Sequence, residues 1–351
     1  MSWLNWKIVL ILAIAAAVLL LYVYFATRAV VPTGPLSTDK RDLSNHLDLH
    51  FTDGFPPSVE VARPSKATSD QSPVLFYFPA WPGFQIDNSL LIDELASHGY
   101  VVISLSYPAK NLDRKKSDLA SRLLAPMDFS SASAFEETRK NADIRLKKRV
   151  ADAEIVYEWL TTLDVSEQTK FFNSPLNLMH VGAFGYSFGG AVAAELCRYI
   201  EPVKVAVNLD GWLFGESVEK GVPCDYLAFS DGSNRPSTGD LNSEAPEKKY
   251  MSELTEQTYV SMDSYMPKFG GVFIKLKGSG HTNFSDSQWH SIIRTLGWPG
   301  RVSAKTATLT VNRYVLAFLD KTIHKNPSTL VSCGAERDKA IELKIWPKCD
   351  E

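Results

Sequence analysis

The chain has 351 residues, of which 45% are hydrophobic and 22% charged, with a formal net charge of −3. That profile is typical of a globular protein and excludes an intrinsically disordered chain. Acidic and basic residues nearly balance, and the sequence carries no long basic run, so a nucleic-acid partner is not indicated.

The first predicted element is an apolar segment without charges, residues 8–25. As a helix it would extend about 27 Å, enough to cross the hydrocarbon core of a bilayer. Tryptophans precede the segment and tyrosines stand near its end, as at the two interfaces of a membrane. A cleaved signal peptide is the alternative, but its apolar region is usually shorter and ends in a small-x-small site, whereas Arg28 follows here. We therefore expect one transmembrane anchor over residues 1–28.

Residues 29–45, with two prolines and mixed charges, are predicted to tether this anchor to one folded domain over residues 46–351. Within the domain, short runs that are apolar, or that alternate apolar and polar residues, are interspersed with amphipathic segments. The predicted strands are 46–51, 58–62, 73–78, 100–107, 179–184, 203–209, 225–230 and 271–276, and the predicted helices are 88–98, 146–163, 191–200 and 311–323. This alternation is typical of an α/β protein with a mostly parallel sheet and helices on both faces.

Two stretches interrupt the alternation. Residues 111–138 carry charges followed by apolar side chains, which indicates either a lid or substrate-binding insertion or a surface helix with a buried stripe. Residues 231–249 are polar and are predicted to form a solvated loop.

Ser187 stands between the apolar run 179–184 and the small-residue stretch 191–200, in Gly185-Tyr186-Ser187-Phe188-Gly189-Gly190. The pattern predicts a strand, a sharp turn and a helix, with glycines where the two backbones approach each other. Such a nucleophile elbow would expose the serine hydroxyl at the edge of the sheet. An ordinary glycine-rich turn is the alternative.

A serine nucleophile needs a neutral imidazole to accept its proton. His281 follows the last predicted strand, in Gly278-Ser279-Gly280-His281, where such a base is expected. The remaining histidines fall inside predicted strands and helices and are interpreted as surface or packing residues: His46, His50, His98, His180, His290 and His324.

Two aspartates compete to orient that imidazole. Asp210 ends the strand 203–209 and precedes an apolar segment that would shield a carboxylate, whereas Asp231 ends the next strand and precedes a polar turn. The residues alone favour Asp210 but leave both open.

The oxyanion that develops in acyl transfer needs two backbone N–H donors. Phe188, directly after the serine, is one candidate, and the other is expected in the loop after the strand 73–78. Proline has no N–H, so Pro79 and Pro82 cannot donate, and Trp81 lies centrally between them. Ala80 and Gly83 are the alternative donors. The loop could also be a simple proline-rich turn with no catalytic role.

The four cysteines show no Cys-x-x-Cys spacing, so neither a metal site nor a disulfide scaffold is indicated. Cys197 is predicted to pack in a helix. A bridge between Cys333 and Cys349 would constrain the unfolded chain by about 3 kcal/mol and would fit an oxidising, extracytoplasmic compartment. The charges around the anchor leave its orientation open.

At these residues the chain resembles the plasma and type II intracellular platelet-activating factor acetylhydrolases, which are serine-dependent α/β-hydrolases. The similarity covers most of residues 73–323. It rests on Leu95-Ala96-Ser97-His98-Gly99, Ser187-Phe188-Gly189-Gly190, Leu209-Asp210-x-Trp212-x-Phe214 and Lys277-Gly278-Ser279-x-His281-x-Asn283-Phe284. One departure lies at Pro79-Ala80, where family members typically have His-Gly, and it puts the acyl preference in doubt.

The resemblance implies an α/β-hydrolase fold and a triad of Ser187, Asp210 and His281, with Phe188 and Trp81 as oxyanion donors. It implies no metal and no other cofactor. The implied reaction is calcium-independent cleavage of a carboxylic ester, with short or oxidised sn-2 acyl groups of phospholipids as favoured substrates. The expected partners are therefore a lipid or small ester and, through the N-terminal helix, a membrane. A serine peptidase of the same fold and a non-catalytic binding module are the alternatives.

Overall fold

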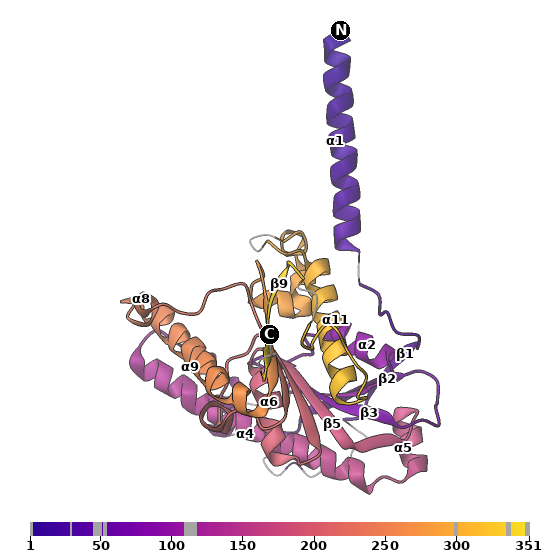
Figure 1. Ribbon diagram of the computed structural model, residues 1–351, viewed down its shortest axis with the longest axis vertical. Helices are drawn as coiled ribbons and strands as arrows, with labels where there is room; N and C mark the ends of the chain where they lie inside the picture. The colour runs from indigo at the N-terminus through magenta and orange to yellow at the C-terminus, as the bar shows by residue number, and fades with distance from the viewer. Residues whose placement is uncertain are drawn as a thin grey trace.

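The computed structural model describes residues 3–28, 30–44, 51, 55–108, 118–297, 301–334 and 338–347. At its centre lies one nine-stranded sheet with the order β1-β2-β4-β3-β5-β6-β7-β8-β9 (Figure 1). Strands β4, β3, β5, β6, β7 and β8 are parallel, while β1, β2 and β9 pair antiparallel at the two edges. The strands are β1 (Thr38–Asp42), β2 (Ser58–Pro64), β3 (Ser72–Phe78), β4 (Val101–Ser106), β5 (Leu176–Tyr186), β6 (Val203–Leu209), β7 (Asp225–Ser230), β8 (Gly271–Leu276) and β9 (Ile341–Trp346).

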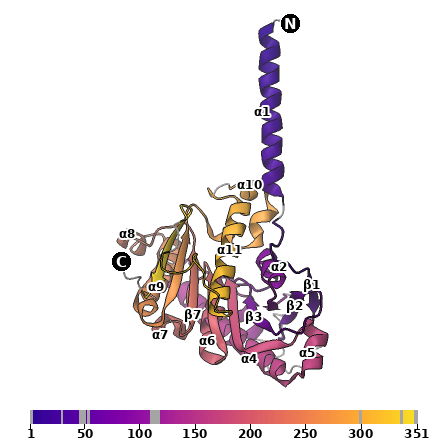
Figure 2. The same ribbon diagram turned by 45° about the vertical axis from the view of Figure 1, so that its right-hand side comes forward.

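Helices cover both faces of this sheet (Figures 1 and 2). Leu146 and Val150 of α4 (Ala132–Thr162) and Val192 of α6 (Phe188–Tyr199) belong to one buried cluster. Leu95 of α2 (Ser89–Ser97) and Val315 of α11 (Ala304–Thr322) belong to the cluster on the other face. The central strands β3 and β4 are buried along their whole length because both faces are covered, which explains why they read as continuous apolar runs. The predicted mostly parallel sheet with helices on both faces is confirmed.

The remaining helices connect or flank these layers. They are α3 (Asp118–Leu124), α5 (Val165–Phe172), α7 (Glu216–Lys220), α8 (Thr238–Leu241), α9 (Pro246–Phe269) and α10 (Ile292–Thr295), with short 3₁₀ turns at His281–Phe284 and Asp286–His290.

Several segments differ from the sequence-based expectation. Part of the predicted tether, residues 29–45, forms the edge strand β1, whose backbone pairs with that of β2. Arg63 of β2 also forms an ion pair with Asp39 of β1. The predicted solvated loop 231–249 contains α8 and the start of α9. Strand β9 was not predicted. The predicted strand 46–51 lies largely outside the described residues, since 45–50 are not described.

The predicted apolar helix is present as α1 (Trp3–Thr27), which projects away from the rest of the molecule along most of its length (Figure 1). Its segment Trp6–Phe25 has a mean hydropathy of 2.9 and no buried part, so by length and composition it could cross a membrane. Near its C-terminal end α1 contacts α10 and α11.

Cys197 does lie in a helix, α6, but it is bonded to Cys224 just before β7. Sequence reasoning missed this pair because the two residues stand 27 positions apart and only the sheet order brings them together. The predicted bridge between Cys333 and Cys349 involves Cys349, which lies outside the described residues.

Candidate active site

Ser187 occupies a strained turn between β5 and α6, with φ at 54°. Glycines make this turn possible, because a Cβ on Gly185 would come within 2.2 Å of the Gly189 backbone. A Cβ on Gly189 would come within 1.9 Å of the Phe78 carbonyl oxygen. A positive φ at a non-glycine residue costs energy that only the surrounding structure can offset. The turn therefore holds the serine hydroxyl outside the sheet, as the sequence pattern predicts.

His281 lies next to this serine although 94 residues separate them in the chain. Its Nε2 is 3.0 Å from Ser187 Oγ, and its Nδ1 is 2.6 Å from Asp210 Oδ2. Ser187 follows β5, Asp210 follows β6, and His281 begins a 3₁₀ turn after β8, so the carboxyl ends of three parallel strands deliver all three side chains to one edge of the sheet. The three predicted residues thus form one connected chain of hydrogen bonds.

Asp231, the competing aspartate, does not contact the imidazole through its side chain. Its backbone N–H instead donates to the second carboxylate oxygen of Asp210, at 2.8 Å. Asp210 itself has φ at 59°. Its backbone N–H donates to the carbonyl oxygen of Phe229 in β7, and the Asn208 side chain bonds the backbone of the next residue, Gly211. The structure therefore places Asp210, and not Asp231, against His281.

The environment favours a protonatable imidazole in a fixed orientation. Desolvation lowers the pKa of His281, but the hydrogen bond and the charge of Asp210 outweigh it, so that the pKa lies above the ordinary value of 6.5. Tyr186 stacks on the imidazole with ring centroids 4.9 Å apart, and its hydroxyl donates to the His281 carbonyl oxygen at 3.2 Å. Tyr186 thus restrains the face of the His281 ring, while Asp210 restrains its Nδ1 edge.

Of the two predicted oxyanion donors, Phe188 directly follows the serine and Trp81 contacts Phe188. Phe188 is the first residue of α6, and the first N–H groups of a helix have no acceptor within that helix. The ring of Trp81 packs edge-on against the ring of Phe188, 5.0 Å away. The N–H of Ala80 is already used, since it donates to Asp87 Oδ2 at 3.0 Å. Of the candidate donors in this loop, Trp81 and Gly83 remain.

Ser187, Asp210 and His281 face a pocket of about 450 Å³. Its walls are mainly apolar, with polar groups gathered near Asp231 and Asn234. Met127 and Phe129 come from the stretch 111–138, so the part of that stretch which the structure describes does contribute to the pocket. The other apolar wall residues are Phe188, Trp212, Phe214, Ala228, Phe229, Met251, Met262 and Phe273.

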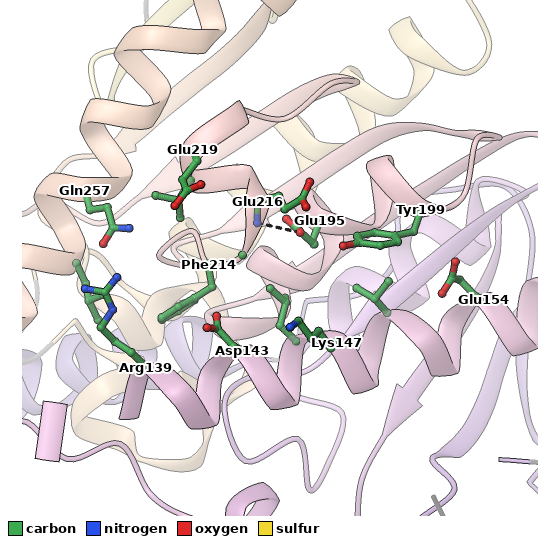
Figure 3. Close-up of a pocket in the computed structure, with 15 residues that line it drawn as sticks. Arg139, Asp143, Lys147, Glu154, Glu195, Tyr199, Phe214, Glu216, Glu219 and Gln257 are labelled. Atoms are coloured by element: carbon green, nitrogen blue, oxygen red, sulfur yellow. Dashed lines mark hydrogen bonds between the residues drawn. The ribbon is translucent and has the colours of Figure 1, made fainter. Parts of the chain in front are cut away.

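A second cavity of about 420 Å³ shares only Phe214 with this pocket (Figure 3). Arg139, Asp143, Lys147 and Glu154 extend into it from α4, opposite Glu195, Glu216, Glu219 and Tyr199. The most buried of these, Glu195, is fully engaged by the N–H groups of Glu216 and Ser217 and by the Ser217 hydroxyl. Within the described part of the chain, neither a serine nor a histidine lines this cavity.

The histidines interpreted as surface or packing residues lie away from Ser187 wherever they are described. His98 contacts Glu94, and His324 packs on Tyr100. His180 is exposed in β5, and His290 ends a 3₁₀ turn, while His46 and His50 lie outside the described residues. Among the residues that the structure describes, no three His, Cys, Asp or Glu side chains gather in a way that could hold a metal ion.

The sheet order, the elbow after β5 and the positions of Asp210 and His281 define an α/β-hydrolase. The fold is similar to that of a ferulic acid esterase from Streptomyces cinnamoneus, with a TM-score of 0.60 and 20% identity over 90% of this chain and 98% of that one.

The family model of platelet-activating factor acetylhydrolase, isoform II, matches residues 56–332, and the chain belongs to that family. A curated relative, the platelet-activating factor acetylhydrolase of Cavia porcellus, is 23% identical over 276 residues. That alignment covers 72% of this chain but only 58% of the relative.

Sequence reasoning did not find the residues that support the triad and the oxyanion loop. Asp87, whose pKa burial raises to about 6, binds Ala80, and Tyr186 supports His281. Arg145 and Arg149 of α4 bind the loop carbonyls. Tyr186 adjoins the serine and could have been proposed from that position, but the other three carry no local signal.

Proposed function

We propose that this protein is a serine carboxylic ester hydrolase that works through an acyl-enzyme on Ser187. The observation that carries the proposal is the continuous hydrogen-bonded chain from Ser187 Oγ through His281 to Asp210 at the mouth of an apolar pocket. Family membership supports the same reaction class. A serine peptidase or a binding module has no specific observation in its favour.

In the proposed mechanism, His281 Nε2 accepts the proton of Ser187 while Oγ bonds to the ester carbonyl carbon. The carbonyl oxygen becomes an oxyanion, which the N–H groups of Phe188 and Trp81 stabilise. The C–O bond to the alcohol then breaks, and His281 returns the proton to the departing alkoxide. Water repeats these steps on the acyl-enzyme and releases the acid. Asp210 keeps Nδ1 protonated, so that Nε2 is free to accept.

The proposed substrates are phospholipids with a short or oxidised sn-2 acyl group. The named activity of the curated relative and the apolar pocket wall support this choice. The loop departs from the family at Pro79-Ala80, so the acyl length preferred here is left to measurement.

We further propose that α1 anchors the enzyme in a membrane, with the catalytic domain on the extracytoplasmic side. The exposed apolar helix supports the anchor. Ile292 and Ile293 of α10 are 56% and 55% exposed beside the end of α1, where they would meet the same bilayer. The Cys197–Cys224 disulfide supports an oxidising compartment.

Activity is tested with purified full-length protein on p-nitrophenyl acetate, p-nitrophenyl octanoate and a phospholipid with a short sn-2 acyl group. Ser187→Ala serves as the control, because it removes the nucleophile and leaves the pocket. We expect hydrolysis by the wild type and none above background by Ser187→Ala. Wild-type rates equal to that background on all three substrates reject the proposal.

The anchor is tested by extracting membranes with alkaline carbonate and determining the intact mass of the retained protein. We expect the uncleaved chain in the membrane pellet, and protease added to sealed vesicles or cells should reach the catalytic domain only from the extracytoplasmic side. A mature N-terminus beyond residue 28 would instead establish a signal peptide.

A further inference from the structure

Arg149 of α4 lies directly beneath the loop that carries the proposed oxyanion donor. Its Nη1 donates to the Pro79 carbonyl oxygen at 2.7 Å, and its Nη2 donates to those of Ala80 and Trp81 at 3.0 and 2.9 Å. One guanidinium thus binds three consecutive carbonyl groups. We propose that Arg149 is a positioning residue that preorganises the oxyanion hole, an inference that rests on the proposed esterase function.

The planar peptide bond converts these contacts into an orientation of the N–H donors. In a trans peptide the C=O and N–H bonds point in opposite directions. Where Arg149 binds the Pro79 carbonyl, the Ala80 N–H of the same peptide points away from it and meets Asp87. Because Arg149 also binds the Ala80 carbonyl, the Trp81 N–H must likewise point away from the guanidinium. Arg149 and Asp87 therefore hold this loop from opposite sides and fix the direction of the Trp81 N–H.

Arg149 also contacts the second proposed donor residue. Its guanidinium carbon lies 5.1 Å from the centre of the Phe188 ring, and that ring packs on Trp81. A cation over an aromatic face is attracted to it. The same side chain therefore touches both residues whose N–H groups would bind the oxyanion, and it sets their separation.

The loop makes room for this guanidinium at Gly83, which has no side chain. Gly83 has φ at +73°, and a Cβ there would come within 2.3 Å of Arg149 Nη2. A neighbouring arginine completes the support, since Arg145 donates to the Trp81 carbonyl and lies 4.1 Å from the centre of the Trp81 ring. The Trp81 indole N–H in turn donates to the Ala125 carbonyl at 2.9 Å.

Burying the charge of Arg149 in this way costs free energy that a purely structural role would not require. Arg149 is 2% exposed, and among the described residues its guanidinium pairs with carbonyl groups and with no carboxylate. Burial lowers the pKa of Arg149 to about 10, which leaves it a cation at neutral pH. The charges of Asp87 and Asp152 favour the cation without bonding to the guanidinium, and burying a cation that is not directly paired is expensive. Its field is favourable where a negative charge develops, which is the situation of an oxyanion intermediate.

The test compares Arg149→Lys with wild type on p-nitrophenyl acetate. Lysine keeps the charge, but its compact ammonium lacks the planar fork that spans three carbonyls. We expect kcat to fall on the order of 10²-fold, as for the loss of one oxyanion donor, with KM changed less than about threefold. A trifluoromethyl ketone, which binds as a tetrahedral oxyanion, should lose affinity by a similar factor.

Arg63→Lys is the matched control. Arg63 is also a buried arginine that binds a carbonyl, that of Phe171, but it lies on β2 beside Asp39 and away from the pocket. We expect this variant to lose thermal stability and to keep its kcat. If Arg149→Lys does not fold, Gly83→Ala carries the same test, because its methyl group displaces the Arg149 guanidinium.

Unchanged kcat and inhibitor affinity in Arg149→Lys, or the same losses in Arg63→Lys at equal melting temperature, overturn the positioning role. A wild type without activity would instead reject the esterase proposal. The two failures are therefore distinguishable.

Discussion

Replacing Asp210 by Asn is the sharpest test of the proposed triad, because both carboxylate oxygens accept a hydrogen bond. Oδ2 faces His281 Nδ1 at 2.6 Å, and Oδ1 accepts the N–H of Asp231 at 2.8 Å. An amide has one oxygen and one NH₂ group. If its nitrogen faces His281, the imidazole must give up the proton on Nδ1 and carry it on Nε2. If its nitrogen faces Asp231 instead, it meets a backbone donor. Only the first orientation satisfies both partners, and it does so with the imidazole in the tautomer that cannot act as the base.

The backbone N–H of Asp231 cannot lose its proton, whereas the imidazole can change tautomer. We therefore expect the amide oxygen to stay with Asp231 and His281 to carry its proton on Nε2. That atom then cannot accept the proton of Ser187. The expected loss in kcat is on the order of 10⁴-fold, which corresponds to roughly 5.5 kcal/mol of transition-state stabilisation.

Asp231→Asn is the matched control, because it leaves the backbone N–H that Asp210 uses in place. Its kcat on p-nitrophenyl acetate should stay within about threefold of wild type. Both variants are measured at the pH at which the wild type has its highest kcat, with circular dichroism as a check on folding. A crippled Asp231→Asn together with an active Asp210→Asn would refute the assignment.

Four further outcomes are expected. The acid limb of the pH profile of kcat/KM should have its midpoint above pH 6.5, because catalysis needs neutral His281 and the triad carboxylate raises its pKa. A midpoint below that value would contradict the described hydrogen bond. Removing both Cys197 and Cys224 by substitution with Ala should lower the free energy of unfolding by roughly 3–4 kcal/mol in urea titrations, since the closed loop is long. An unchanged urea midpoint would show that the bridge does not stabilise the fold. Deleting residues 1–28 should move the enzyme from the carbonate-resistant pellet to the soluble fraction with unchanged kcat/KM on p-nitrophenyl acetate, and retention in the pellet would argue against the anchor. Phe129→Ala should raise the ratio of kcat/KM for p-nitrophenyl octanoate over acetate on the order of tenfold, because Phe129 lines the pocket wall, and an unchanged ratio would remove it from the acyl site.

Much of the fold followed from the sequence because buried parallel strands carry an unmistakable pattern. Strand β4 lies within its predicted segment and β3 begins one residue before its own, and all residues of both strands are buried. The elbow was also predictable, since only glycines fit at Gly185 and Gly189 and their spacing around Ser187 is local. Edge strand β1 could not be predicted, because its sequence Thr-Asp-Lys-Arg-Asp has a polar pattern without the apolar residues that mark a strand.

The choice between Asp210 and Asp231 shows where sequence pattern stops being informative about a site. Both follow a parallel strand, and both stand at the same edge of the sheet. The difference arises from the backbone of Asp210, whose φ of 59° turns it toward His281 while the Asp231 N–H supports it from behind. A conformation of that kind leaves no mark on composition or spacing. The apolar segment after Asp210 favoured it beforehand but left Asp231 open, and the resemblance to a family strengthened that preference.

The same limit applies more strongly to α4. Its residues Arg145, Lys148, Arg149 and Asp152 recur at helical spacing, and such a charged stripe is typical of a solvated helix face. All four are buried. They can be buried because the loop at 79–83 presents carbonyl groups to the arginines and because Lys148 pairs with Asp152. A loop with two prolines has fewer N–H groups than carbonyls, so its surplus acceptors need donors from elsewhere. The proline-rich loop and the buried cations are therefore complementary parts of one structure, although neither predicts the other from its own sequence.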